Sequence, residues 1–211
     1  MRLISLVLCA LLLCGPAKAQ DNRQAEFDYY VLALSWTPDW CALHGDSEGA
    51  AECAKHGLTF TLHGLWPQYD AGGFPIDCRS AARDPSRQDT AAMQDIMGSD
   101  GLAWHEWKTH GRCSGLSAGD YLALMRKAYA AITVPPLFAA VRTPLHIAPE
   151  VIGQAFLEAN PSLSAQGIAV TCEQSMITEL RICLTKDLAP RACGPAFRRC
   201  HAAVADMAPI R

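Results

Sequence analysis

The sequence predicts an α+β fold with an antiparallel sheet core and several helices, in a single disulfide-bonded domain. The 211 residues are 50% hydrophobic and 18% charged, which is typical of a globular protein. Strand-like and helix-like segments alternate with turn residues, and no internal repeat, low-complexity tract or linker divides the chain. The length suits one domain with its own core.

The first residues predict a secretory signal peptide. Arg2 precedes an apolar run that ends at Gly15-Pro16, and Ala17-Lys18-Ala19 forms an A-x-A cleavage site. We therefore expect residues 1–19 to be removed and residues 20–211 to form a monomeric domain that is periplasmic or secreted. No later segment reaches the roughly 20 apolar residues of a membrane span, so we expect no membrane partner.

Removal of the signal peptide changes both the charge and the cysteine count. Loss of Arg2 and Lys18 would take the net charge from −3 to −5. Proteins that hold nucleic acid by charge alone are usually basic, so a phosphate-bearing substrate would need a local site. The eight remaining cysteines predict up to four disulfides, with about 105 possible pairings. A zinc site is disfavoured because the sequence contains no C-x-x-C motif.

Four segments are predicted as strands. Residues 27–36 are aromatic and β-branched and are expected to form a central strand. Residues 58–63 alternate apolar and polar side chains, and this strand is expected to end before Gly64. Residues 167–171 and 176–184 are β-rich and are expected to form a hairpin or neighbouring strands.

Helices are predicted over residues 89–97, 102–110, 118–131 and 149–159. Gly111 is expected to end the second helix in the C′ position. Ser117 and Asp120 resemble a capping box at the start of the third, and Pro149 suits the first turn of the fourth. Residues 71–87 and the cysteine-rich C-terminal stretch are expected to form loops.

The second predicted helix carries a cluster of titratable side chains. At about 100° per residue, His105, Glu106, Thr109 and His110 fall within an arc of about 140°. A carboxylate beside two imidazoles favours imidazolium, so this face could supply an acid or a base near neutral pH. The rival interpretation is a zinc site, but its H-E-x-x-H motif needs histidines four residues apart, whereas these are five apart. A solvated helix with incidental histidines is the remaining alternative.

His63 stands at the end of the second predicted strand and is followed by Gly64-Leu65-Trp66-Pro67. A histidine that leaves a strand into such a turn has a fixed direction. Trp66 offers a flat face on which a base could stack, worth about 1–3 kcal/mol, although it could equally belong to the core.

Together these segments resemble the ribonuclease T2 family of secreted endoribonucleases. Residues 61–67 and 105–113 match its two catalytic signatures, and residues 27–36 are similar to its first core strand. The resemblance covers essentially the whole predicted mature chain.

The resemblance implies cleavage of single-stranded RNA without a metal or other cofactor. The ribose 2′-OH attacks the adjacent phosphorus, and a 2′,3′-cyclic phosphate forms. Such a step needs a base for the 2′-OH, an acid for the leaving 5′-oxygen and positive charge near the phosphoryl oxygens. By the family pattern His110 is the base and His63 the acid, while His105 contacts the phosphate and Glu106 orients and polarises the reacting group. DNA lacks the nucleophile, so no stable DNA partner is expected.

The family pattern also implies a base-recognition site. Trp66 corresponds to its stacking aromatic residue, and Phe74 is a candidate for the second wall of the same pocket. Gln68 stands where some members carry an Asp that reads the base edge. Because an amide both donates and accepts hydrogen bonds, low base specificity is expected. Structural roles for Gln68 and Phe74 agree equally well with the sequence.

One position departs from the family pattern. The family usually places Lys immediately before the His-Gly of the second signature, but here Thr109 stands there and Lys108 precedes it. On a helix this shift moves the ammonium by about 100°. Either the flexible side chain of Lys108 still reaches the phosphate, or the site is one cation short, with Arg112 a less favoured substitute. We expect the second.

The resemblance further implies a Cys78–Cys113 disulfide that holds the two catalytic segments together. By the same analogy the remaining pairs are Cys41–Cys53, Cys172–Cys200 and Cys183–Cys193. Histidines outside the motifs are expected to be structural or exposed.

Two alternative functions remain at this point. One is an inactive RNA-binding or other binding protein on the same fold. The other is a zinc hydrolase that uses His105, Glu106 and His110.

Overall fold

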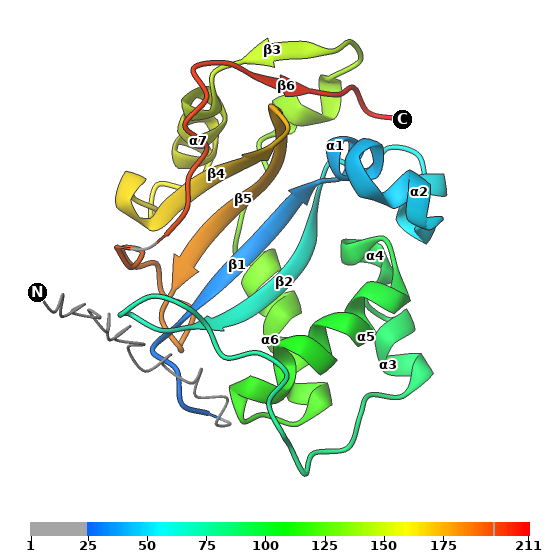
Figure 1. Cartoon of the computed structure of the whole chain (residues 1–211), viewed down its shortest axis with the longest axis vertical. Helices are drawn as coiled ribbons and strands as arrows, with labels where there is room; N and C mark the ends of the chain where they lie inside the picture. The colour runs from blue at the N-terminus through cyan, green and yellow to red at the C-terminus, as the bar shows by residue number, and fades with distance from the viewer. Residues whose placement is uncertain (1–24, 196) are drawn as a thin grey trace, which may run out of the picture.

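A six-stranded sheet runs through the molecule, and helices pack against it (Figure 1). The computed structural model describes residues 25–195 and 197–211, so the signal peptide predicted at residues 1–19 lies outside the described residues. The strands are β1 (Tyr29–Trp36), β2 (Phe60–Gln68), β3 (Leu145–Ile147), β4 (Ile168–Glu173), β5 (Met176–Leu184) and β6 (Ala205–Met207). The helices are α1 (Thr37–Trp40), α2 (Asp46–Glu48), α3 (Arg87–Ala91), α4 (Gln94–Met97), α5 (Asp100–Thr109), α6 (Ala118–Ala130) and α7 (Pro149–Ala159). None of the helices in the described residues is long and apolar enough to cross a membrane.

Four antiparallel strands form the centre of the sheet, in the order β2-β1-β5-β4. β6 joins β5 through one parallel pair, Met176 with Asp206, and β3 pairs antiparallel with β6. In Figure 1 these two short strands lie at the end of the molecule opposite α3 and α5. The predicted α+β class with an antiparallel sheet core is confirmed, with this one parallel contact added.

The two faces of β1 have different surroundings because successive strand side chains point to opposite sides. Leu32, Leu34 and Trp36 belong to the main core, which α6 covers behind β1 and β2 in Figure 1. Tyr29 and Val31 belong to a second, smaller apolar cluster on the opposite face. That second face carries the cleft described below.

The prediction that the second strand ends at His63 is wrong, because β2 continues to Gln68. Its pairing with β1 shifts at this point: Leu34 lies opposite Leu62, whereas Ala33 lies opposite Gly64. His63 is therefore the extra residue of a β-bulge. Such an insertion reverses the in-out alternation, so Leu62 and Leu65 both reach the core although they are three residues apart.

Other boundaries also differ from the predictions. The helix predicted over 89–97 is divided into α3 and α4, and the Arg126 guanidinium from α6 donates a hydrogen bond to the Ala92 carbonyl at the break. The C-terminal stretch is not all loop, because it contains β6. This three-residue strand pairs with partners about 60 residues earlier, as His146 with Asp206, so its own sequence gives little signal.

Gly111 stands in the expected C′ position, because α5 ends at Thr109 and His110 is its C-cap. The φ of Gly111 is not positive, however, and a 3₁₀ turn follows over Gly111–Ser114. Instead, Gly111 is needed for close packing, since a Cβ there would lie 2.6 Å from the Trp107 ring and 2.7 Å from Tyr121. The missing side chain lets α5 approach α6.

Four disulfides join the chain, in the pairs that the family resemblance implies: Cys41–Cys53, Cys78–Cys113, Cys172–Cys200 and Cys183–Cys193. The Cys78–Cys113 bond closes the longest loop, with a sequence separation of 35 residues. In the chain-entropy model a loop of this size stabilises by about 3–4 kcal/mol. It ties the segment after β2 to the end of α5.

A buried carboxylate holds the C-terminal segment in place. Asp39 has no exposed surface, and its Oδ1 accepts a hydrogen bond from the Ala208 amide at 2.7 Å. The Trp36 indole donates to the Ala208 carbonyl at 3.1 Å, so both backbone groups of Ala208 are satisfied. The other oxygen of Asp39 has no partner among the described residues. Burial raises the pKa of Asp39 to about 7, although its backbone hydrogen bonds act in the opposite direction.

We expect Asp39→Asn to stabilise the protein at pH 8. Because the pKa of Asp39 is higher in the folded than in the unfolded chain, folding stability falls as the pH rises from about 4 to about 7. The amide cannot ionise, but it leaves a buried N–H unsatisfied, so the net gain should be about 1–3 kcal/mol. Thermal unfolding at pH 8 measures it, and the gain should vanish at pH 4.

Asp46→Asn is the matched control. Asp46 is exposed, and its hydrogen bonds with Arg211 lower its pKa, so it contributes stability above its unfolded pKa and loses it as the pH falls. Its removal should not stabilise the protein at pH 8. Equal melting temperatures for wild type and Asp39→Asn at pH 8 would contradict the conclusion that ionised Asp39 destabilises the folded protein.

Candidate active site

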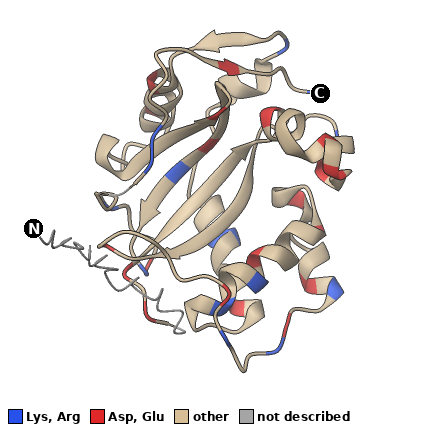
Figure 2. Cartoon of the chain, in the orientation of Figure 1, with Lys and Arg blue, Asp and Glu red and all other residues tan. Residues whose placement is uncertain are grey.

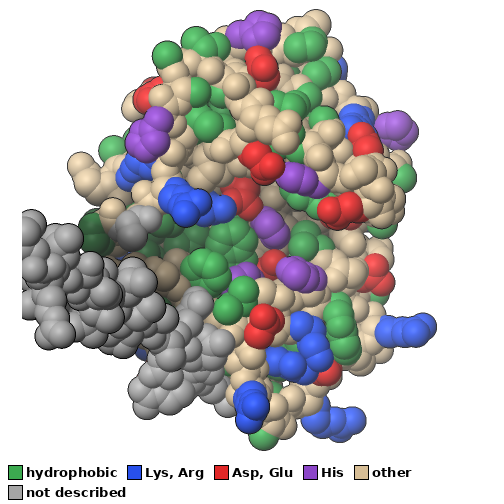
Figure 3. Space-filling model, in the orientation of Figure 1, with side chains coloured by type: hydrophobic (Ala, Val, Ile, Leu, Met, Phe, Trp, Pro, Cys, Tyr) green, Lys and Arg blue, Asp and Glu red, His purple; other side chains and the backbone are tan. Residues whose placement is uncertain are grey.

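A cleft of about 840 Å³ opens on the face of the sheet that carries Tyr29 and Val31. Figure 3 shows histidine side chains gathered in the middle of this face, beside acidic and hydrophobic side chains that line a hollow. Seven of the predicted site residues line the cleft: His63, Trp66, Gln68, Phe74, His105, Glu106 and His110. Residues 40 apart in the sequence, Trp66 of β2 and Glu106 of α5, therefore meet at one cavity.

His63 is fixed from both sides of its ring by carboxylates. The Nδ1 atom donates to Oε1 of Glu179 at 2.5 Å, and Nε2 lies 3.6 Å from Oε1 of Glu106. Its side chain is 26% exposed, toward the cavity that it lines. Because Nδ1 is engaged, Nε2 is the nitrogen available to a ligand.

Glu179 and Arg181 complete this cluster and were not foreseen from the sequence. They are the two charged residues of β5, two positions apart and hence on one face of the strand. Figure 2 shows acidic and basic positions on the ribbon of β5. Oε2 of Glu179 accepts from Arg181 Nε at 2.7 Å and Nη2 at 2.6 Å. The sequence does contain a signal for them, because an acidic and a basic residue at positions i and i+2 of a largely apolar strand indicate an ion pair on one face of the sheet.

The cluster separates the pKa values of its members. Burial on its own would lower the pKa of His63, but the hydrogen bond and charge of Glu179, with the charge of Glu106, raise it to about 9. Burial likewise opposes ionisation of Glu179, yet its contacts with His63 and Arg181 lower its pKa to about 2. At neutral pH His63 is therefore an imidazolium and Glu179 a carboxylate.

Glu106 is held by the β2 segment rather than by its helix neighbours. It is 1% exposed, and its Oε2 accepts the indole N–H of Trp66 at 2.7 Å. Burial raises the pKa of Glu106 to about 7, against the opposing charge of His63 and the Trp66 hydrogen bond. Gly64 makes this approach possible, since a Cβ there would lie 2.0 Å from the same oxygen.

His110 has the opposite character from His63. It caps the end of α5, and its ring centroid lies 5.4 Å from that of Trp66. Burial, with the charges of His63 and His105, lowers the pKa of His110 to about 3. Its Nδ1 is buried without a hydrogen-bond partner among the described residues, so Nε2 is the nitrogen that can meet a ligand.

The titratable cluster expected on one helix face, two imidazoles beside Glu106, also includes a partner from another element. His105 is exposed, with Nε2 3.5 Å from the Thr109 hydroxyl, and His110 is neutral. The imidazolium that faces Glu106 is His63, which comes from β2. Helix geometry alone could not reveal a partner from another element.

Lys108 lies outside the cleft. Its Nζ is 3.5 Å from Oδ2 of Asp84 and 5.7 Å from the centre of the Trp104 ring. Arg112 donates to Oδ1 of the same carboxylate at 2.7 Å. Asp84 thus holds both cations that the sequence offered near His110, whereas Thr109 does line the cavity.

The aromatic side chains of the cleft differ in accessibility. The Arg181 guanidinium lies over the ring of Trp66, 5.1 Å from its centroid, and His63 meets this ring edge-on at 5.1 Å. Phe74 is 38% exposed and follows Gly72 and Gly73, whose positive φ angles shape the turn. Phe74 is thus the more open surface for a flat ligand, while Trp66 also positions Glu106.

Two links hold the loop with Phe74 against α5. The Asp77 amide donates to the Thr109 carbonyl at 2.9 Å, and the Cys78–Cys113 disulfide follows immediately. One wall of the cleft is therefore fixed relative to His110.

The described residues contain no group of three or more His, Cys, Asp or Glu side chains placed to hold a metal ion. His105, Glu106 and His110, the set considered for zinc, do not converge.

The sequence of this chain is similar to those of known ribonucleases. The model of the ribonuclease T2 family matches residues 27–193. A ribonuclease from Aeromonas hydrophila is 40% identical over 118 residues, which is 54% of this chain and 52% of the relative. Ribonuclease 3 of Arabidopsis thaliana is 30% identical over 46% of this chain and 49% of its own. The chain thus matches about half the length of these curated relatives.

Solved structures share the fold. Trichomaglin, described as an S-like ribonuclease, matches with a TM-score of 0.67 and 22% identity over 88% of this chain and 100% of its own. RNase NT in complex with 5′-AMP matches with a TM-score of 0.61 and 21% identity over 88% of this chain and 100% of its own.

We expect Glu179→Gln to lower the pKa of His63. The substitution removes the hydrogen-bonded charge that outweighs burial, so the pKa should fall from about 9 to below the ordinary value of 6.5. Proton NMR titration of the imidazole measures this shift directly.

Glu173→Gln provides the matched control, because Glu173 contacts His44 at 3.0 Å and neither residue lines the cleft. It should leave the His63 titration unchanged. A His63 pKa that stays near 9 in Glu179→Gln would contradict the role given to Glu179.

Proposed function

The chain belongs to the ribonuclease T2 family, and from this premise we propose that it is an exported endoribonuclease that cleaves single-stranded RNA by transphosphorylation. The observation that carries the proposal is the presence of two histidines in one cavity whose pKa values are shifted in opposite directions. Such a pair supplies an acid and a base at the same pH, which this reaction requires.

His110 is the proposed general base. It is neutral in the free protein, and its buried Nδ1 leaves Nε2 as the nitrogen that accepts the proton of the ribose 2′-OH. The 2′-oxygen then attacks the adjacent phosphorus. The anionic phosphodiester, once bound, offsets the positive charges that depress the His110 pKa, and so makes the ring a stronger base.

His63 is the proposed general acid. Its Nε2–H gives a proton to the departing 5′-oxygen as the P–O5′ bond breaks, which leaves a 2′,3′-cyclic phosphate and a 5′-hydroxyl. The carboxylate of Glu179 keeps His63 protonated before the P–O5′ bond breaks, and it orients the ring through its hydrogen bond with Nδ1. The two histidines then have exchanged protonation states.

Glu106 and His105 are proposed to act on the phosphoryl group. The raised pKa of Glu106 keeps a fraction of this side chain protonated near neutral pH, and in that form it can donate a hydrogen bond to a phosphoryl oxygen. A fully ionised carboxylate would repel the phosphate. His105 lies at the exposed side of the cleft, where it can contact the phosphate.

RNA is the proposed partner, bound with low base specificity. RNase NT, which has a similar fold, was crystallised in complex with 5′-AMP. The cleft of this chain is lined by Phe74, Trp66 and Gln68, which can receive a base. Stacking accepts any base, and the amide of Gln68 can either donate or accept. Four disulfides fit the proposed export of residues 20–211, because such bonds persist in oxidising compartments.

The test is the cleavage of an RNA homopolymer in the presence of EDTA, with analysis of the ends. We expect EDTA-resistant cleavage with 2′,3′-cyclic phosphate ends and no cleavage of the same oligomer with 2′-O-methyl ribose. Cleavage that EDTA abolishes would favour a metal-dependent hydrolase. Binding without cleavage would favour an inactive binding protein.

His63→Ala and His110→Ala should each reduce turnover by at least about 10²-fold, because general acid–base groups typically contribute about 10²–10⁴. Turnover on one RNA substrate measures the loss. His146→Ala is the control, since this histidine lies on the surface, 77% exposed, and contacts only Asp206 among the interactions described for it. Near-wild-type turnover in either cleft variant would reject that residue's assignment.

The pH dependence of kcat/KM should be bell-shaped with a broad top. The acidic limb reflects protonation of His110, whose pKa is lowered, and the alkaline limb reflects loss of the proton from His63, whose pKa is raised. In Glu179→Gln the alkaline limb should move to lower pH. An alkaline limb at the same pH in both proteins would show that it does not report His63.

A further inference from the structure

We propose that Arg181 contacts the phosphoryl oxygens of the scissile phosphate and is the cation that stabilises their developing charge. The proposal rests on the proposed ribonuclease function and names a residue outside both signature segments. It places the phosphate between β5 on one side and α5 on the other.

The first argument is the supply of positive charge. Attack by the 2′-oxygen increases the negative charge on the phosphoryl oxygens, and fixed cations or hydrogen-bond donors must meet it. Lys108 and Arg112 are committed to Asp84. Of the Lys and Arg side chains in residues 25–195 and 197–211, only Arg181 and Arg198 line the cleft.

The second argument is the fixed position of Arg181. Glu179 holds the guanidinium through Nε and Nη2, and the Trp66 ring lies 5.1 Å from it. Nη1 is not part of this ion pair, and the side chain is 28% exposed in the cleft. An arginine held in this way keeps a donor edge for a phosphate oxygen and needs little reorganisation when the charge develops.

The third argument is the charge of the cluster as a whole. The carboxylate of Glu179 is shared between His63 and Arg181, so these three groups together carry one net positive charge. Glu179 therefore orients both cations and leaves one positive charge in excess. The proposed acid and the phosphate cation are each one hydrogen bond from the same carboxylate, which fixes their separation.

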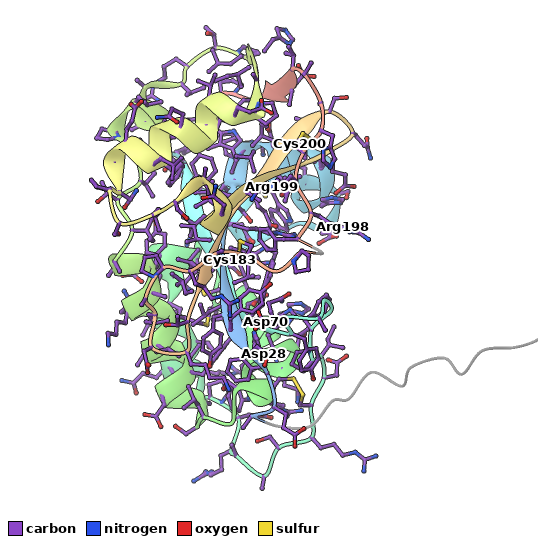
Figure 4. All side chains as sticks on the ribbon, turned by 90° about the vertical axis from the view of Figure 1, so that its left-hand side faces the viewer. Asp28, Asp70, Cys183, Arg198, Arg199 and Cys200 are labelled. Atoms are coloured by element: carbon purple, nitrogen blue, oxygen red, sulfur yellow. A yellow bond between two sulfur atoms is a disulfide. The ribbon has the colours of Figure 1, made fainter. Side chains whose placement is uncertain are left out.

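Arg198 is the weaker candidate for this role. It is exposed and belongs to the C-terminal segment near Cys200, which in Figure 4 runs above Asp28 and Asp70. None of the contacts described for the cleft holds its guanidinium in one position. An exposed cation at the rim that no contact orients can attract RNA but is poorly suited to stabilise one transition state.

The test compares Arg181→Gln and Arg181→Lys with the wild type in two assays. The first is turnover on one RNA substrate, and the second is the inhibition constant of inorganic phosphate. Arg181→Gln should lose about 10²-fold or more in turnover and bind phosphate at least about tenfold more weakly. Arg181→Lys keeps a charge and should retain more of both. Lys108→Gln is the control and should match the wild type, because Lys108 lies outside the cleft.

An indirect effect through His63 is separated by NMR titration. The charge of Arg181 lowers the pKa of His63, so its removal should leave that pKa as high or higher. If Arg181 acted only by positioning Glu179, the pKa of His63 would fall in Arg181→Gln as it does in Glu179→Gln, and this result would overturn the proposal.

Thr109→Lys supplies a rescue experiment. Thr109 lines the same cavity, so a lysine there brings an ammonium to it from α5. The double variant Arg181→Gln/Thr109→Lys should regain at least about tenfold in phosphate affinity relative to Arg181→Gln. Failure to regain it would overturn the view that the defect is a missing cation.

Two outcomes distinguish this proposal from the proposed function. An Arg181→Gln variant that folds and still binds phosphate as tightly as the wild type overturns the role of Arg181, while ribonuclease activity stands. A wild-type protein that releases no cyclic-phosphate product overturns the ribonuclease function itself. Thermal unfolding establishes that each variant is folded.

Discussion

The hydrogen bond between His63 and Glu179 is the constraint on which the cleft depends. The two residues belong to β2 and β5, which are separated by β1, so their side chains must meet over an intervening strand. Neighbouring strands lie about 4.8 Å apart, and a contact across two spacings requires small residues between them. β1 provides these as Ala33 and Ser35, opposite Arg181 and Glu179. The β-bulge at His63 then turns the imidazole toward this gap while the flanking leucines stay in the core.

The arrangement also explains how two charged and two neutral ionisable groups coexist at and behind one cleft wall. Glu179 and His63 stabilise each other's charged forms, whereas Glu106 and His110 are pushed toward their neutral forms. Desolvation acts on all of them, and only the groups with a bonded partner of opposite charge overcome it. Charged and neutral members thus coexist because the partners are distributed unequally. Trp66, placed between them, links the β2 segment to α5 through its indole N–H.

The sequence foretold the parts of this site that depend on local pattern. The α+β class and the central first strand follow from alternation and capping, and the residues that line the cleft from β2 and α5 follow from short motifs and from the family resemblance. Glu179 and Arg181 could not be found in the same way, because their roles depend on the order of strands in the sheet. The β-bulge at His63 could not be recognised, because it interrupts the alternation of buried and exposed side chains in the same way as the end of a strand does. The position of Lys108 depends on Asp84, a residue in a loop whose path the sequence does not specify.

The pairing of Asp84 with Lys108 and Arg112 has a consequence for how a polyanion is captured. Binding of a nucleic acid strand is driven in large part by the release of condensed counterions, and the gain grows with the number of phosphates that the protein neutralises. In the described part of this chain Asp84 pairs with both Lys108 and Arg112, so these two cations are less available to neutralise phosphates. The net charge of the whole sequence is −3. Under the proposed function, a strand in the cleft would displace few ions. We then expect its affinity to derive mainly from stacked bases and the one proposed phosphate contact, and to vary little with ionic strength.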